Sequence, residues 1–148
     1  MKQEDYIKFN KYEIIKISLE QAEIFESEKD ETVGHFYKIL PLKEDLSEIE
    51  TYQGIKFKGT EEMPYNIEIV LKANFSIYVE EQKMKEDMII FNIPAIQYPY
   101  LRSAISMVAS LSNNNCSNIV LPTVNFLELM KDTKIQDLII ELEDDKIN

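Results

Sequence analysis

Alternation of hydrophobic and polar residues is the strongest pattern in the first half of the chain. From Ile67 to Val79 every odd-numbered residue is hydrophobic, and most even-numbered residues are polar. A period of two over this length is typical of one long β-strand with a buried face and a solvated face. Weaker alternation predicts three earlier strands, over residues 11–22, 35–42 and 51–60.

The first predicted strand carries hydrophobic side chains on both faces. Strict alternation places Tyr12 and Ile14 on one face, and Ile15, Ile17 and Leu19 on the other. Strands of this kind are covered, at least in part, on both sides. We therefore expect other parts of the protein to contact each face of this strand.

Helical spacing replaces alternation in the second half. Hydrophobic residues recur at positions 101, 104, 105, 108 and 111, which is the spacing of one buried helix face. Pro99 is predicted to lie in the first turn of this helix, where its missing N–H costs no hydrogen bond. A second helix is predicted to begin at Asn125, because Glu128 completes the spacing of a capping box. Positions 135, 138, 139 and 142 fit either a continuation of that helix or a further helix capped by Thr133.

The predicted order of elements is therefore β-β-β-β-α-α, which defines an α+β fold. Short connections favour a four-stranded antiparallel sheet in meander order, followed by two helices. No linker or internal repeat divides the 148 residues, so we expect one domain over residues 1–148. Residues 141–148 are mostly charged and are expected to fray.

Composition narrows the classes of function. The formal net charge of −11 argues against a nucleic-acid-binding protein, because Lys and Arg drive phosphate binding. The same charge fits basic polypeptides as partners, or serves solubility alone. Cys116 is the only cysteine, so we expect no internal disulfide and no cysteine zinc site. The pattern predicts neither a signal peptide nor membrane insertion, and the cytoplasm is the expected location.

Residues that carry catalytic or metal-binding chemistry are sparse. His35 is the only histidine, and neither a second histidine nor a second cysteine could complete a metal site with it. Gly34, Gly54 and Gly59 are the only glycines, and none belongs to a phosphate-binding loop. ATP hydrolysis is therefore not expected. We expect no enzyme, no metal and no cofactor.

Two segments resemble the SecB family of protein-export chaperones. The segment that opens the long helix in that family corresponds here to Pro94-x-Ile96-x-Tyr98-Pro99-Tyr100-x-Arg102. The segment that opens the last helix corresponds to Leu121-x-x-Val124-Asn125-Phe126. The spacing between the two is close to that of the family, and the order of strands and helices is that of the SecB fold. One departure is Ser112-Asn113-Asn114-Asn115, which stands where SecB proteins usually carry a glycine-containing turn.

The resemblance implies an ATP-independent holdase that binds unfolded polypeptides, such as preproteins, along extended grooves. It also implies a homotetramer in which the long helices pack between pairs of sheets. An alternative is a partner-specific interaction module, because some SecB-like proteins protect the antitoxin of a toxin–antitoxin pair. A small-ligand or enzymatic α+β domain is a third hypothesis, which a deep polar pocket would favour.

Candidate client-binding residues are apolar side chains that one small domain has difficulty burying. Phe36, Leu40 and Leu42 share one face of the second predicted strand, while Tyr37 and Ile39 share the other. The whole set of client-binding candidates is Phe36, Leu40, Leu42, Tyr98, Tyr100, Phe126 and Met130.

The resemblance also implies a docking surface for the export motor SecA. Acidic residues on the first strand of SecB proteins bind a basic, zinc-bearing tail of SecA. The matching stretch here is Lys16-Ile17-Ser18-Leu19-Glu20, whose first and last positions are acidic in the family. Glu20 fits and is the candidate SecA-docking residue, whereas Lys16 reverses the charge at the other position. We therefore expect SecA binding to be weak or absent.

Overall fold

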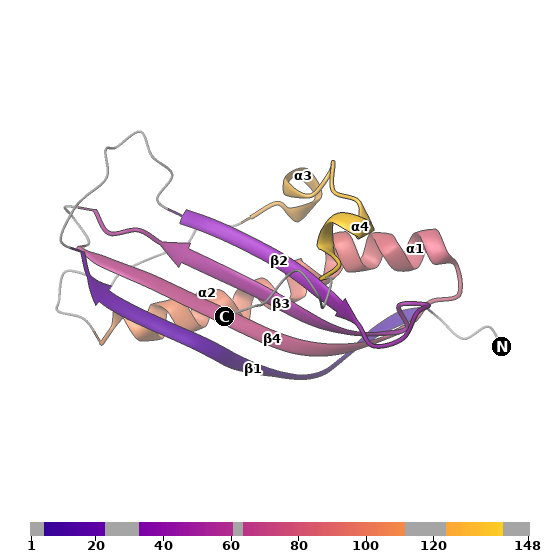
Figure 1. Cartoon of the computed structure of the whole chain (residues 1–148), viewed down its shortest axis with the longest axis horizontal. Coiled ribbons are helices and arrows are strands. Elements are labelled where there is room, and N and C mark those ends of the chain that lie inside the picture. The colour runs from indigo at the N-terminus through magenta and orange to yellow at the C-terminus, as the bar shows by residue number, and fades with distance from the viewer. Residues whose placement is uncertain (1–4, 23–32, 61–63, 112–123, 141–148) are drawn as a thin grey trace.

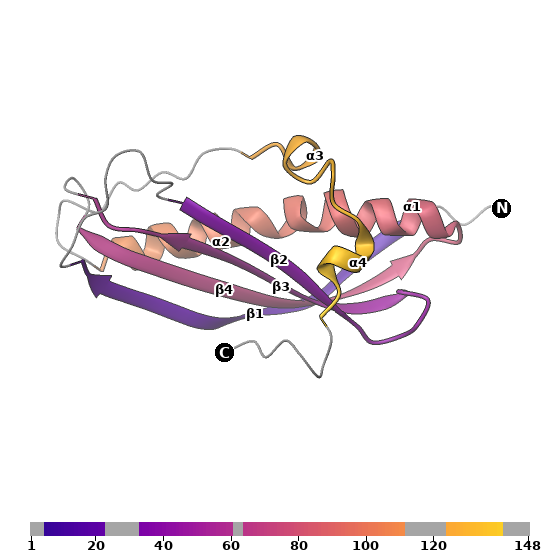
Figure 2. The same cartoon turned by 45° about the horizontal axis from the view of Figure 1, so that its top comes forward.

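The framework of the protein is a four-stranded antiparallel sheet. The computed structural model describes residues 5–22, 33–60, 64–111 and 124–140. The strands are β1 (Tyr6–Gln21), β2 (Val33–Pro41), β3 (Glu48–Phe57) and β4 (Tyr65–Tyr78). A long helix runs along one face of the sheet, which we call the inner face (Figures 1 and 2). The predicted α+β fold is confirmed.

The strand order is β1-β4-β3-β2, so β1 pairs with β4 and not with β2. The meander prediction is therefore wrong for β1, although β2, β3 and β4 follow it. Strand length gives the reason, because β1 and β4 have 16 and 14 residues whereas β2 and β3 have 9 and 10. Pairing the two longest strands leaves fewer backbone groups unpaired. As a result, β1 and β2 form the two edges of the sheet.

The odd-numbered side chains of β4 lie on the inner face and form the centre of the core. Ile69, Leu71 and Phe75 are fully buried. They belong to one hydrophobic cluster with Leu101 and Ile105 of the long helix. The alternation predicted for this strand is confirmed, and its polar positions form the opposite, outer face of the sheet.

Two β-bulges alter the faces of β1. The register with β4 shifts at Asn10 and again at Ile15. A bulge adds one residue to one strand, so the side chains beyond it change faces. Ile17 and Leu19 therefore lie on the inner face together with Ile14, opposite Ile69, Ile67 and Leu71 of β4. The prediction that Ile17 and Leu19 face away from Ile14 is wrong for this reason.

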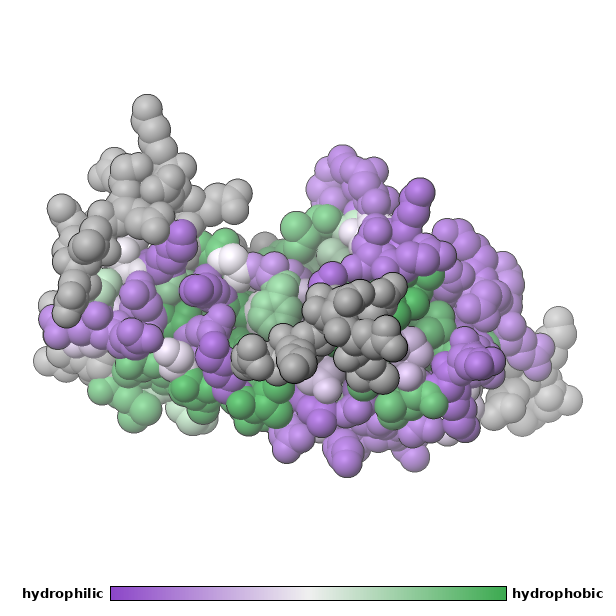
Figure 3. Space-filling model, in the orientation of Figure 1, coloured by the Kyte–Doolittle hydropathy of each residue, from purple (hydrophilic) through white to green (hydrophobic). Residues whose placement is uncertain are grey.

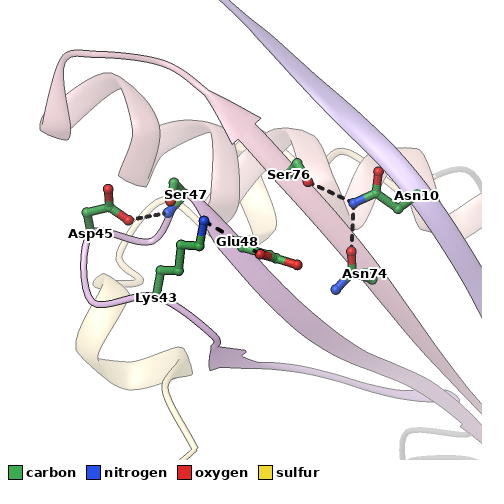
Figure 4. Close-up of polar contacts among 7 residues, drawn as sticks. All are labelled: Asn10, Lys43, Asp45, Ser47, Glu48, Asn74 and Ser76. Carbon is green, nitrogen blue, oxygen red and sulfur yellow. Dashed lines mark hydrogen bonds and ion pairs between the residues drawn. The ribbon is translucent and has the colours of Figure 1, made fainter.

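Polar side chains hold the outer face at the first bulge. The Asn10 side-chain amide donates to Asn74 Oδ1 at 2.6 Å and to Ser76 Oγ at 2.8 Å (Figure 4).

In the turn between β2 and β3, the Ser47 N–H donates to Asp45 Oδ1 at 3.0 Å (Figure 4). Hydrogen bonds from Ser47 hold the pKa of Asp45 below its ordinary value.

The long helix begins well before Pro99. Helix α1 (Gln82–Asp87), the π-helical segment η1 (Met88–Asn92) and helix α2 (Ile93–Ala109) follow one another without a break. Pro94 occupies the first turn of α2, and Pro99 lies inside the helix. The prediction that Pro99 marks the first turn is wrong, because the hydrophobic segment before it continues the helix.

A hydrogen bond from the sheet accompanies the π segment. The Ile93 N–H bonds to the carbonyl of Met88. In a regular α-helix it would bond to Ile89. The Ile89 carbonyl instead accepts the Tyr37 hydroxyl of β2 at 2.7 Å. Burial raises the pKa of Tyr37 well above its ordinary value, so this hydroxyl keeps its proton and its role as donor.

Two short helices, α3 (Phe126–Leu129) and α4 (Ile135–Leu138), follow. Asn125 caps α3 as predicted, and its side chain accepts from Leu127 N at 3.1 Å and Glu128 N at 3.3 Å. The cap of α4 is Lys134 and not Thr133, because Asp137 Oδ2 accepts the Lys134 N–H at 2.9 Å. Cys116, the Asn-rich stretch and the predicted frayed end at 141–148 lie outside the described residues.

Candidate functional site

A hollow of about 440 Å³ lies between α3 and the long helix. We call it the α3 groove, and its lining residues come from η1, α2, the segment before α3 and α3 itself. They are Phe91, Asn92, Ala95, Ile96, Val124, Asn125, Phe126 and Leu127. Leu127 is 68% exposed, and Ile96 is also exposed. The α3 groove therefore presents hydrophobic side chains to solvent beside two polar amides.

The side of the α3 groove toward β2 is aromatic. The Phe126 ring is buried and meets the Tyr98 ring edge-on, with 5.5 Å between centroids. It also contacts the His35 ring of β2 at 5.6 Å. Phe126 thus joins α3 to both the long helix and the sheet, which fixes the position of a four-residue helix that could not be stable alone.

A second exposed hydrophobic region lies where α2 passes β1. The Tyr100 ring lies 4.7 Å from the Tyr12 ring and 5.5 Å from the Phe9 ring. Phe9 stacks in turn on the buried Phe75 at 4.7 Å. Tyr12 and Tyr100 are exposed, so their rings form an aromatic patch that is open to solvent on one side and contacts the core through Phe9 on the other.

The two regions join across α2. Leu127 and Ile96 line the same groove, Ile96 and Tyr100 are one helical turn apart, and Tyr100 touches Tyr12. We call the exposed side chains Leu127, Ile96, Tyr100 and Tyr12 the apolar band. Hydrophobic side chains also gather along the β1 edge, at the lower left of Figure 3. Contiguous exposed hydrophobic surface of this kind is typical of interaction sites.

A buried chain of hydrogen bonds runs beneath the α3 groove. The Gln97 side chain of α2 donates to Gln53 Oε1 at 2.7 Å and bonds to Thr51 on the same strand, β3. Gln53 Nε2 lies 3.3 Å from the Pro94 carbonyl and 2.9 Å from His35 Nε2. Because Gln53 Nε2 can only donate, His35 Nε2 must accept, which requires a neutral imidazole. Burial lowers the pKa of His35 to about 4, in agreement with that state.

The predicted client-binding residues lie in three different places. Phe36, Leu40 and Leu42 come from β2 and the turn after it, and the Phe36 ring lies directly over Gly54 on the outer face. Tyr100 belongs to the apolar band. Tyr98, Phe126 and Met130 are almost fully buried and offer little surface, and of these three only Phe126 lines the α3 groove.

Sequence reasoning did not single out Ile96, Leu127 or Tyr12 as binding residues. The signal for Leu127 was available, since four of the five residues in Phe126-Leu127-Glu128-Leu129-Met130 are hydrophobic, which is more than one side of a short helix can bury. The meeting of Tyr12 with Tyr100 depends on the pairing of β1 with β4, which the predicted meander did not contain.

The predicted SecA-docking stretch lies at the outer face near the end of β1. Lys16, Ser18 and Glu20 line one open hollow of about 530 Å³, so Lys16 and Glu20 share a face as predicted. Lys16 forms an ion pair with Glu68 of β4. Lys56 and Lys58 line the same hollow, which gives this surface a mixed charge.

Within residues 5–22, 33–60, 64–111 and 124–140, no group of three or more His, Cys, Asp or Glu side chains could hold a metal ion. In the same part of the chain, no helix is long and apolar enough to cross a membrane.

Comparison with known proteins gives the family. The model of the family described as preprotein translocase subunit SecB matches residues 5–137. The chain belongs to the SecB family. SecB proteins are chaperones and not enzymes, so the expectation of a non-enzymatic SecB-like chaperone is confirmed. No curated protein sequence matches the chain.

Two solved structures share the SecB fold at low sequence identity. One is the Mycobacterium tuberculosis Rv1957 SecB-like chaperone in complex with a ChAD peptide from the Rv1956 HigA1 antitoxin, with a TM-score of 0.56 and 8% identity. The similarity covers 80% of this chain and 89% of that chain. The other is a protein of unknown function from Streptococcus agalactiae, with a TM-score of 0.55 and 7% identity over 82% of this chain and 100% of that chain.

Proposed function

We propose that this SecB-family protein is an ATP-independent holdase whose apolar band binds unfolded polypeptide segments. The observation that carries the proposal is the continuity of exposed hydrophobic side chains from α3 across α2 to β1. Aromatic and branched side chains give large contact areas without demanding one client sequence. Binding the unfolded state preferentially keeps a client from folding or aggregating.

The charge of the protein restricts the clients. With a net charge of −11, the protein attracts basic segments and repels acidic ones. The best client is therefore a hydrophobic stretch flanked by Lys or Arg. Salt weakens only the attraction between charges, so capture of such clients persists at high ionic strength in reduced form.

Suppression of aggregation tests the proposal. Thermally unfolded citrate synthase is incubated with an equimolar amount of the protein, and light scattering is followed with and without ATP. We expect scattering to fall strongly and ATP to have no effect. Unchanged scattering for this and other slow-folding clients would remove the support for a holdase.

A matched pair of leucines on α3 tests where the client binds. Leu127 lines the α3 groove, whereas Leu129 is also exposed, at 53%, but does not line it. We expect Leu127→Asp to weaken client binding about tenfold, as for a central interface residue, and Leu129→Asp to change it little. Equal effects of both changes would place the client elsewhere.

A dedicated partner is the second candidate function. The Rv1957 chaperone, which shares this fold, is bound to a peptide of an antitoxin. A protein of that kind serves one partner and need not meet the export machinery. Isolation of the protein with its natural partners distinguishes the two, since a holdase yields many polypeptides and a dedicated module yields one.

We also propose that the working form is a homotetramer. Beyond the apolar band, Met107 of α2 and Leu111, which follows the end of the helix, are 68% and 76% exposed. Contact between the α2 helices of neighbouring subunits would cover these side chains. Association driven by this end of α2 leaves the α3 groove at the other end open to clients.

A further inference from the structure

Strand β2 is an edge of the sheet, and its edge away from β3 already pairs with a short piece of chain. The Ile140 N–H donates to the Ile39 carbonyl at 2.8 Å, and Ile139 forms a parallel β-bridge with Ile39. Because Ile39 is an internal residue of an edge strand, its carbonyl must point away from β3 to accept this bond. The backbone groups of Tyr37 and His35, two and four residues earlier, point the same way.

The residues before this short strand are held firmly to β2. Ile135 and Leu138 of α4 are buried in the core, and Lys38 Nζ donates to the Asp137 carbonyl at 2.8 Å. Figure 2 shows α4 beside β2. Ile140 is only 7% exposed, so its side chain is buried and its N–H is hydrogen-bonded.

The β2 edge also borders the α3 groove. The ring of Phe126, which lines the groove, contacts His35 on β2. A strand added along this edge would place alternate side chains toward Phe126 on the inner side, and toward Phe36 and Leu40 on the outer side. Main-chain hydrogen bonds along an edge are independent of sequence, which suits the capture of unrelated unfolded segments.

We propose that the β2 edge is a strand-acceptor site for an extended client segment, and that Ile139 and Ile140 occupy one end of it in the free protein. A client that adds along the whole edge must displace the Ile140 N–H from the Ile39 carbonyl. This inference rests on the proposed holdase function and specifies how a client backbone is held. It gives a role to the β-bridge that Ile139 forms with Ile39 directly after α4.

Proline at position 140 removes the bond, although it also replaces a buried side chain. Proline has no N–H, and the extended backbone of Ile139, with φ −70° and ψ 127°, suits a residue that precedes proline. The probe is a short fluorescent peptide of alternating Val and Thr residues with Lys at both ends. Gln136→Ala, in an exposed position of α4, is the control.

We expect Ile140→Pro to bind the probe about fivefold more tightly than the wild type, which corresponds to one hydrogen bond that no longer competes. Gln136→Ala should bind as the wild type does. Amide hydrogen exchange of the unaltered protein gives a second reading. The probe should expose the Ile140 amide and protect those of His35 and Tyr37, while those of Phe36 and Lys38, which face β3, stay unchanged.

The outcomes separate the inference from the holdase proposal. Equal probe affinity of Ile140→Pro and wild type, or an Ile140 amide that stays protected at saturation, overturns the strand-acceptor site alone. If the probe binds neither protein and citrate synthase aggregates freely, both proposals fail. Because the exchange measurement uses the wild type, the inference stays testable even if the proline variant folds poorly.

Discussion

The buried polar chain from His35 to Thr51 is the most informative feature at the scale of single residues. It places Gln53 and Gln97 fully inside the core, where unpaired amides would be costly. Each amide is satisfied by its neighbours, and the chain joins β2, β3 and α2. His35 lies at its end, half-buried beside Phe126. The protonation state of one imidazole is therefore coupled to the packing around the α3 groove.

The first prediction concerns acid stability. The pKa of His35 is about 4 in the folded protein and 6.5 ordinarily, so below pH 6.5 the unfolded chain takes up a proton that the folded chain does not. The unfolding free energy should therefore fall between pH 6.5 and 4, by about 3 kcal/mol in total from this residue. Above pH 6.5 this residue should contribute no pH dependence.

Urea denaturation across this pH range measures the effect. His35→Gln keeps a polar side chain that does not titrate. Its pH profile therefore reports the contribution of all other titrating groups and serves as the reference. The wild type should lose more stability on acidification than His35→Gln does. Parallel pH profiles for the two proteins would contradict the assigned role of His35.

The second prediction concerns Lys16 and the SecA tail. Lys16 repels a basic tail, and its ion pair with Glu68 also occupies one of the nearby carboxylates. We expect the isolated zinc-loaded SecA tail to bind weakly or not at all in a calorimetric titration. Lys16→Glu should strengthen binding by adding a carboxylate and freeing Glu68. Tight binding by the wild type that Glu20→Lys abolishes would contradict this interpretation.

At the scale of elements, the third prediction concerns Pro99. A proline inside a helix lacks one backbone donor and crowds the preceding turn. Pro99→Ala should therefore raise the unfolding free energy by roughly 1–3 kcal/mol in urea denaturation. Pro94→Ala is the control. Proline is well tolerated in a first helical turn and the Pro94 ring is buried, so this change should give no gain in stability. A Pro99→Ala protein no more stable than the wild type would contradict the prediction.

The same proline shows what sequence could and could not predict. Alternation located β4, and helical spacing located the buried Leu101, Ile105 and Val108 of α2, because both patterns depend on local geometry alone. The same spacing placed Leu111 on the buried face, but Leu111 lies beyond the end of α2 and is 76% exposed. Pro99 was interpreted as the start of a helix, although the helix begins at Gln82. In the sequence, a proline in the first helical turn looks the same as a proline inside a helix. The faces of β1 depend on bulges at Asn10 and Ile15, and no local pattern marks an unpaired residue.

The candidate site was predictable only in part. Tyr100 was singled out correctly as an exposed aromatic residue, since a tyrosine beside a helix proline stands out in the sequence. Tyr98 and Phe126 were singled out by the same reasoning, yet they face the core. Which side of a helix is covered depends on tertiary packing, and the pairing of Tyr12 with Tyr100 depends on strand order.

At the scale of the whole molecule, the fourth prediction concerns assembly. The exposed side chains of Met107 and Leu111 lie at the end of α2, on the face that we propose subunits share. Static light scattering at micromolar concentration should report a tetramer for the wild type. Met107→Glu should reduce the measured mass, because it buries a charge at the contact.

Gln136→Glu adds the same charge at an exposed position of α4 and should leave the mass unchanged. A wild-type protein that scatters as a monomer would contradict the proposed architecture. If the mass is that of a tetramer in all three proteins, subunits associate through a surface other than this end of α2.

The π-helical segment has a consequence for the angular phase of the long helix. Each residue of an α-helix turns the chain by about 100°, and η1 accommodates one residue more than regular α-helical turns would. On one side of it, Lys85 is buried and donates to the Asp45 carbonyl at 2.8 Å; on the other, Ile96 and Tyr100 face outward. Because five residues of a π-helical turn cover about the same angle as four α-helical residues, deleting a single residue from Met88–Asn92 would restore a regular helix and leave both halves in their present directions. Deleting a residue between Lys85 and Ile96 but outside η1 would instead turn one half by about 100°, so either Lys85 would leave its carbonyl or the apolar band would turn toward the sheet.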